Sequence, residues 1–143
     1  MSAAISKMKA FWPGLAILFA AGCAANSGRP HLVRIAKPLF GGEALYTGAI
    51  GVHRGCVVTE GGGKRATILF DPDVTLVDGG TAIRDGLGVV IKFGERVRPG
   101  AATLRQNGRG WSLHDINAFY GVELPENCPQ DEVVRLHDFK PVG

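Results

Sequence analysis

From Tyr46 to Leu104 the chain alternates between short apolar runs and turns rich in glycine, aspartate and proline. Within the runs, apolar residues recur at every second position, as Val89, Ile91 and Phe93 do. This period places the apolar side chains on one face of a strand, which is typical of a half-buried sheet. The turns stand at His53-Arg54-Gly55, Gly61-Gly62-Gly63, Asp71-Pro72-Asp73, Asp78-Gly79-Gly80 and Pro99-Gly100. Many short strands with closely spaced turns predict a mainly β fold, a small antiparallel β-barrel or sandwich.

One segment, near residues 112–120, has helical rather than strand spacing. Ser112 is a favourable capping residue, and Asp115 follows three positions later, as in a capping box. Gly121 is a suitable stop, because glycine adopts the left-handed conformation that ends many helices. The apolar residues that share one helical face are Leu113, Ile116, Phe119 and Tyr120. We therefore predict one short helix with this face toward the core and with Trp111 packed at its start.

The first part of the chain has the layout of a secretory signal peptide. Lys7 and Lys9 precede an apolar run over residues 11–21, and small residues end that run. The run is too short to cross a bilayer, which takes about 20 residues. A buried core helix is the alternative, and Pro13-Gly14 disfavours it. We predict that residues 1–22 are a signal peptide.

The run Leu18-Phe19-Ala20-Ala21-Gly22-Cys23 resembles the lipobox of bacterial lipoproteins. The resemblance implies that Cys23 carries a diacylglyceryl group, that the chain is cut before it, and that the new amine is acylated. Ala20 stands where the family prefers Leu, so ordinary signal-peptidase cleavage nearby remains the alternative. Residues 23–38 would then be the lipidated Cys and a tether, and residues 39–143 a single β-rich domain. The alternative for residues 31–40 is an edge strand or the start of the domain. Ala24, in place of an Asp, favours the periplasmic face of the outer membrane in a host with two membranes.

The chain has three cysteines, Cys23, Cys56 and Cys128. If Cys23 carries lipid, the two that remain in an oxidising compartment predict one disulfide, Cys56–Cys128. The rival reading makes Cys56 a catalytic nucleophile with His114 or His53 as its base. Its apolar neighbours in the sequence favour the disulfide, because a reactive thiolate needs exposure.

Charge is unevenly distributed along the chain. Removal of Lys7 and Lys9 leaves 14 of 16 basic residues against 13 acidic ones, a net charge of +1. Residues 84–109 hold six cations against Asp85 and Glu95, a net charge of +4, and residues 110–143 have a net charge of −4. The six cations are Arg84, Lys92, Arg96, Arg98, Arg105 and Arg109. Ordinary solvated faces explain such a distribution, and the functional alternative is a surface that binds anionic lipid or an envelope polymer.

The stretches Gly48–Val58, Ile68–Pro72 and Val90–Val97 resemble a pattern of small secreted bacterial β-domains with no assigned activity. That resemblance implies a β fold and no function.

No catalytic, metal or cofactor site is predicted from the residues. The four histidines lack metal-ligand spacing, and Ser112, His114 and Asp115 are too close in sequence to converge as a triad. We expect a non-enzymatic structural or interaction role in the cell envelope, with the membrane as partner through the lipid anchor. A second envelope protein or an anionic polymer is a further expected partner, and nucleic acid is not. The alternatives are a binding module for anionic lipid or glycan and a small hydrolase built on Cys56 or His114.

Overall fold

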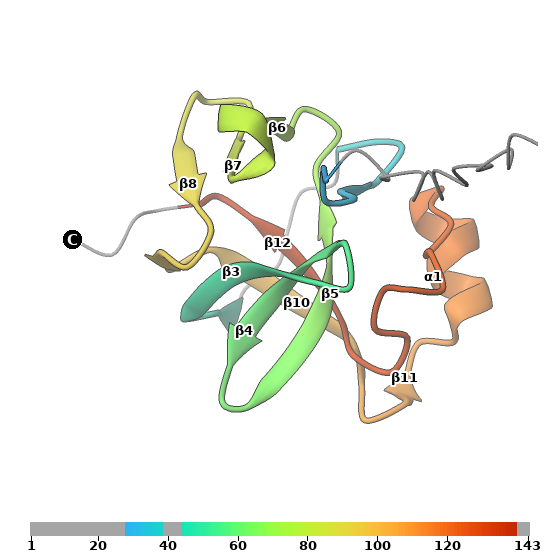
Figure 1. Cartoon of the computed structure of the whole chain (residues 1–143). Helices are drawn as coiled ribbons and strands as arrows, with labels where there is room; N and C mark the ends of the chain where they lie inside the picture. Colours follow the sequence, from blue (N-terminus) through green and yellow to red (C-terminus); the bar gives the residue numbers. More distant parts are fainter. Residues whose placement is uncertain (1–27, 39–43, 140–143) are drawn as a thin grey trace, which may run out of the picture.

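The computed structural model describes residues 28–38 and 44–139 and shows a β-rich molecule with one α-helix at its side (Figure 1). In chain order the elements are β1 (Val33–Arg34), β2 (Ala44–Leu45), β3 (Gly48–His53), β4 (Cys56–Gly61), β5 (Lys64–Phe70), β6 (Thr75–Val77), the 3-10 turn η1 (Asp78–Gly80), β7 (Ala82–Arg84), β8 (Val90–Lys92), β9 (Arg96–Val97), β10 (Gly100–Gln106), β11 (Arg109–Gly110), α1 (Leu113–Tyr120) and β12 (Val133–His137). In the described part of the chain, no helix has the length and apolar character needed to span a membrane.

The large sheet has nine strands in the order β11-β10-β12-β5-β4-β3-β9, with β1 added beside β5 and β2 beside β10. The predicted mainly β class and single short helix are confirmed. The sheet is mixed rather than wholly antiparallel, because β12 and β1 both pair with β5 in the parallel sense. A parallel pair requires a crossover, and the chain from β6 to α1 makes the connection from β5 to β12. The sheet does not close into a barrel.

The small sheet is an antiparallel meander, β6-β7-β8. Its first two strands are joined through η1, where Asp78, Gly79 and Gly80 have φ angles of 54°, 70° and 90°. Two glycines adopt this conformation at low cost, which is why the Asp-Gly-Gly turn predicts a hairpin here. In β8, Ile91 is buried while Val90 and Lys92 face outward, as the alternation predicts.

Both faces of the large sheet are covered, and each carries its own core. Neighbouring residues of the central strands point to opposite faces, so that Val57 and Ile68 enter one core while Val58 and Leu69 enter the other. The first core lies between the large and small sheets and includes Phe70, Ile83, Ile91 and Leu136. The second core packs under α1 and includes Ile116, Tyr120, Cys56 and Cys128. The result is a three-layer molecule with α1 on the face away from the small sheet.

The helix α1 begins and ends where the sequence predicts. The Ser112 hydroxyl accepts a hydrogen bond from the backbone N–H of Asp115 at 3.1 Å, and Gly121 ends the helix in the left-handed conformation. Ile116 and Tyr120 are buried. Phe119 is 61% exposed, so its assignment to the core-facing side is wrong. The helix has only eight residues and packs at the edge of the second core, which leaves room for few of its side chains.

Residues 28–38 belong to the folded domain and not to the tether in which the sequence places them. Val33 pairs with Leu69 in β5, and the N–H of Ile35 donates to the Phe70 carbonyl at 2.9 Å. Val33 and Ile35 are almost fully buried while Arg34 between them is exposed. The alternation of a strand is therefore present here, and the domain includes the chain from Gly28 onward.

Candidate functional site

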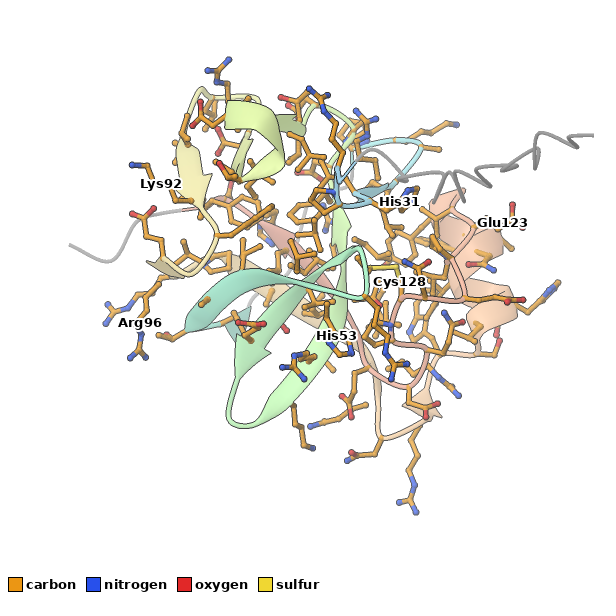
Figure 2. The ribbon with its side chains drawn as sticks, in the orientation of Figure 1. His31, His53, Lys92, Arg96, Glu123 and Cys128 are labelled. Carbon is orange, nitrogen blue, oxygen red and sulfur yellow. A yellow bond between two sulfur atoms is a disulfide. The ribbon has the colours of Figure 1, made fainter. Side chains whose placement is uncertain are left out.

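A disulfide joins Cys56, at the start of β4, to Cys128, in the segment between α1 and β12 (Figure 2). The two Cα atoms are 5.3 Å apart, and both residues are buried in the second core. This is the pair that the cysteine count predicts. A disulfide sulfur carries no thiolate, so the alternative in which Cys56 acts as a nucleophile is wrong.

The residues that suggest catalysis or metal binding in the sequence have other roles in the structure or lie far from one another. Ser112 caps α1, and His114 stands exposed on that helix. The His137 ring contacts the Asp138 carboxylate at 3.0 Å. Within residues 28–38 and 44–139, no three histidine, cysteine, aspartate or glutamate side chains are grouped so that they could hold a metal ion.

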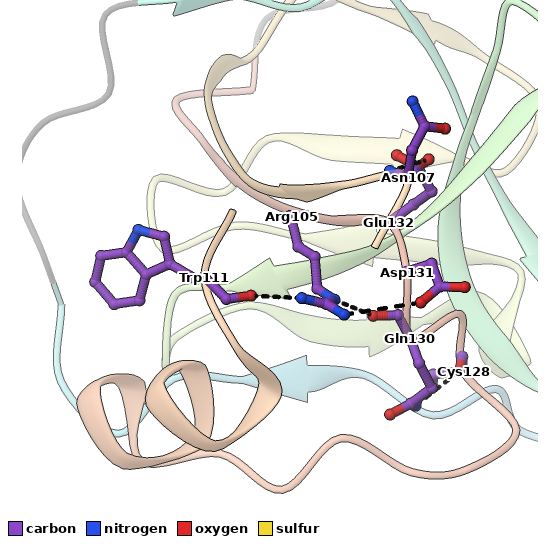
Figure 3. Close-up of polar contacts among 7 residues, drawn as sticks. All are labelled: Arg105, Asn107, Trp111, Cys128, Gln130, Asp131 and Glu132. Carbon is purple, nitrogen blue, oxygen red and sulfur yellow. Dashed lines mark hydrogen bonds and ion pairs between the residues drawn. The ribbon is translucent and has the colours of Figure 1, made fainter. Parts of the chain in front are cut away.

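Arg105, one of the six cations of the predicted anion-binding face, holds three segments of the chain together through hydrogen bonds and an ion pair (Figure 3). Its Nε donates to the Gln130 carbonyl at 3.1 Å and its Nη1 to the Trp111 carbonyl at 2.9 Å. Its Nη2 also lies 3.9 Å from the Asp131 carboxylate, and its side chain is only 19% exposed. The guanidinium therefore joins β10 to the segments before α1 and before β12, and few of its donors remain for an external anion.

The other five predicted cations are exposed but do not form one site. Lys92 and Arg96 extend from one side of the molecule, opposite Glu123 and α1 (Figure 2). Arg109 lies in β11, next to α1 and far from β8 (Figure 1). The exposed residues of this set are Arg84, Lys92, Arg96, Arg98 and Arg109. The predicted face reduces to Arg84, Lys92, Arg96 and Arg98, with Arg84 in β7 beside β8. None of these four has an ion pair with another described residue.

A second cationic surface, which the sequence does not single out, follows residues 28–38. We call these residues the cationic segment: they include Arg29, Arg34 and Lys37, all exposed, and no carboxylate. None of the three cations has an ion pair with another described residue. Arg29 and Arg34 line a hollow of about 350 Å³ together with Thr75 and Leu76. The sequence does contain a signal for this surface, because residues 28–38 hold three cations and no acid. The assignment of these residues to a tether draws attention away from it.

An aromatic patch, defined by Trp111, Phe119 and Tyr120, adjoins the end of the cationic segment. The Trp111 ring centroid lies 5.3 Å from that of Phe119 and 5.8 Å from that of Tyr120. The backbone N–H of Ala36 donates to the Tyr120 carbonyl at 2.9 Å, which fixes the segment to the end of α1. Lys37 and Phe119 line one hollow of about 250 Å³. Trp111 and Phe119 are 39% and 61% exposed, which makes this patch a candidate contact surface.

Tyr120 is the buried member of the aromatic patch. Burial raises the pKa of its phenol above the ordinary value of 10.0, and the positive charge of Arg135 partly offsets that rise. Arg135 is itself 3% exposed, and its Nη2 lies 3.4 Å from the Asp71 carboxylate. This buried charge lies inside the fold, so it serves the packing of β12 rather than a surface site.

A small pocket of about 170 Å³ opens between β4, β5, β10 and β12. Its lining includes Tyr46, Thr59 and Thr103, with Lys64 and Glu132 also in the wall. The Lys64 ammonium donates to the Asn107 side chain, and the Glu132 carboxylate accepts from the Asn107 backbone N–H. These charged groups are thus engaged with the turn between β10 and β11, and the pocket is smaller than the roughly 300–1,000 Å³ of most ligand sites.

No family model matches the chain, and no curated protein or solved structure matches it. Similarity to known proteins therefore assigns neither a family nor an activity.

Proposed function

We propose that this chain is an exported lipoprotein of the bacterial cell envelope, anchored by lipid on Cys23, whose β domain has a structural or interaction role. In a host with two membranes, Ala24 after Cys23, in place of an Asp, favours the periplasmic face of the outer membrane. The expected partners are the membrane itself and another envelope protein or polymer.

The observation that supports the proposal is that two of the three cysteines form a disulfide and the third ends the apolar run. Cys56 and Cys128 are joined in the second core, and the third, Cys23, stands at the end of an apolar run with the lipobox pattern. The buried disulfide is compatible with an oxidising compartment outside the cytoplasm. The folded domain includes Gly28, five residues after Cys23, so a lipid at Cys23 would sit immediately before the domain. Two or three acyl chains would hold it stably, at about 0.8 kcal/mol for each buried methylene.

The test is the intact mass and N-terminal residue of the mature protein, produced from the full chain in a bacterium. We expect a mature chain that starts at Cys23 and carries the mass of the acyl groups. The matched control is C23S, which should lose the acyl mass and leave the membrane fraction while its Cys56–Cys128 disulfide stays intact. A wild-type protein that starts at Ala24 or later, without acyl mass, would refute the anchor.

A second candidate is a binding module for an anionic envelope glycan. It is supported by the exposure of Lys92, Arg96 and Arg98, which have no ion pairs with other described residues. Lys92 and Arg96 extend from one side of the molecule (Figure 2). Binding of an anionic polysaccharide that weakens with salt, and weakens further in K92Q/R96Q/R98Q, would favour it. Equal binding by wild type and this variant would argue against it.

A further inference from the structure

We propose that the cationic segment and the aromatic patch form a membrane-docking face, which holds the domain flat on the anionic bilayer that contains its own lipid anchor. This inference rests on the proposed lipidation of Cys23. It adds an orientation: the surface around residues 28–38 and the exposed rings of Trp111 and Phe119 face the lipid headgroups.

The first argument is the reach of the chain between the anchor and the domain. Gly28 is five residues after Cys23, and an extended chain spans at most about 3.6 Å per residue, or about 18 Å here. A domain of about 100 residues has a radius of gyration of about 13 Å and is therefore roughly 30 Å across. The anchor is thus too short for the far side of the domain to reach the bilayer. Only surfaces near Gly28 can lie against it.

The second argument is the charge of the surface that carries Gly28. Figure 1 shows residues 28–38, in blue, between the β6 end of the molecule and α1. Arg29, Arg34 and Lys37 are exposed along this segment. The neighbouring elements carry acids of their own: Asp78 lies in η1, which contacts Arg29, and Glu123 follows the turn after α1. Asp71 and Asp73 follow β5, the strand that pairs with β1, and Asp71 already forms an ion pair with Arg135. Three cations over a segment without carboxylates suit an anionic leaflet, whose phosphates attract Lys and Arg near the surface.

The third argument is the position of the exposed aromatic rings. Phe119 and Lys37 line the same hollow, and Phe119 contacts Trp111, so the rings continue the cationic segment. Trp and Tyr are enriched where a protein meets the headgroup region, because their apolar bodies leave water there while their polar groups stay hydrated. An exposed Phe costs free energy in water, and burial in the interfacial region would recover part of that cost.

The alternative orientation uses the cations around Lys92, Arg96 and Arg98. Lys92 and Arg96 extend from the side of the molecule opposite α1 (Figure 2), and Arg98 is exposed two residues after Arg96. The two faces cannot lie on one bilayer together, so a position-specific probe separates them.

The first experiment measures quenching of Trp111 fluorescence by brominated lipids. The chain has two tryptophans, and Trp12 lies in the predicted signal peptide, so Trp111 would be the only one in the mature protein. The lipidated protein, with its acyl mass verified first, is placed in vesicles of phosphatidylglycerol and phosphatidylethanolamine. The matched control is W111F/V90W, which moves the tryptophan to β8, where Val90 is 36% exposed on the opposite side (Figure 1).

We expect strong quenching of Trp111 and little quenching of the tryptophan at position 90. The reverse result would overturn the proposal in favour of the Lys92 side. Equal quenching at the two positions, or quenching at neither, would also overturn it, because no face would then be preferred. A protein without acyl mass would refute the proposed anchor and is recognised before the quenching is measured.

The second experiment needs no lipid anchor and therefore tests the face separately. The mature C23S chain is mixed with the same vesicles at low salt, and its partitioning is compared in two variants that lose the same charge. R29Q/R34Q/K37Q should bind about 100-fold more weakly, since each cation at an anionic surface contributes roughly five-fold. K92Q/R96Q/R98Q should bind as C23S does. If K92Q/R96Q/R98Q weakens binding as much as R29Q/R34Q/K37Q does, or more, the proposal is overturned.

Discussion

The disulfide should supply a large part of the stability of this domain. Cys56 and Cys128 are 72 residues apart in sequence, so their bond closes most of the domain into one loop. On the chain-entropy model, closure of a loop of this length raises the free energy of unfolding by about 4 kcal/mol. Domains of ordinary size have only about 5–15 kcal/mol in total. The C56A/C128A double variant should therefore remain folded at low temperature, but close to the limit.

The assay is urea unfolding of C23S and of C23S/C56A/C128A, followed by far-ultraviolet circular dichroism. With a urea slope of about 2 kcal/mol per molar, the midpoint should fall by roughly 2 M. C56A and C128A alone should each match the double variant, because either one deletes the same bond. The reasoning is refuted if the losses of stability in C56A and C128A add up in the double variant. It is also refuted if the urea midpoint of the double variant equals that of C23S.

Two further predictions concern the buried charge and the buried phenol. Asp71→Asn removes a carboxylate partner of Arg135 and should lower the free energy of unfolding by about 2 kcal/mol, less than the roughly 3–5 kcal/mol of fully buried pairs because Asp71 is 27% exposed. D71N/R135M should recover most of this loss in thermal unfolding, and a double variant no more stable than D71N would contradict it. Because burial raises the pKa of Tyr120 in the folded state, this group's contribution to stability is complete below pH 10 and is lost as the pH rises through the folded pKa. Tyrosinate absorbance in Y46F, which leaves Tyr120 as the remaining tyrosine, should show ionisation above the ordinary value, and Y120F should lose less stability at alkaline pH.

Local patterns in the sequence predict local structure well in this chain. Ser112 and Gly121 mark the ends of α1 because capping depends on residues within one turn. The Asp78-Gly79-Gly80 turn predicts the β6–β7 hairpin because positive φ angles are needed there and glycine supplies them.

The long-range arrangement could not be predicted in the same way. The alternation within a strand shows which face is buried but not which neighbour it pairs with, so the parallel pairing of β12 with β5 was missed. The exposure of Phe119 also depends on where α1 packs rather than on the spacing of its residues.

The candidate surfaces show the same limit. Arg105 and Arg96 look alike in the sequence, but only Arg105 meets two backbone carbonyls of segments distant from β10. Arg34 separates Val33 from Ile35, so the sequence suits an edge strand at the start of the domain as well as the tether to which residues 23–38 are assigned. The structure therefore adds residues 28–38 as a candidate membrane surface beside the exposed cations of residues 84–109.

The position of β12 determines the order in which this molecule can be completed. β12 is the last strand in the chain, yet it lies between β10 and β5 in the sheet. The N-terminal part of the chain emerges first, in synthesis and in the proposed export, so the β3–β4–β5 meander is available before the strand that joins it to β10. Until β12 arrives, β5 has an open edge at this position, and Cys56 has no partner. Non-local pairings of this kind make folding slow, and unpaired strand edges and apolar surface stay exposed until the pairing forms. Loss of the C-terminal segment would consequently divide the sheet at its centre, whereas loss of an edge strand would only shorten it.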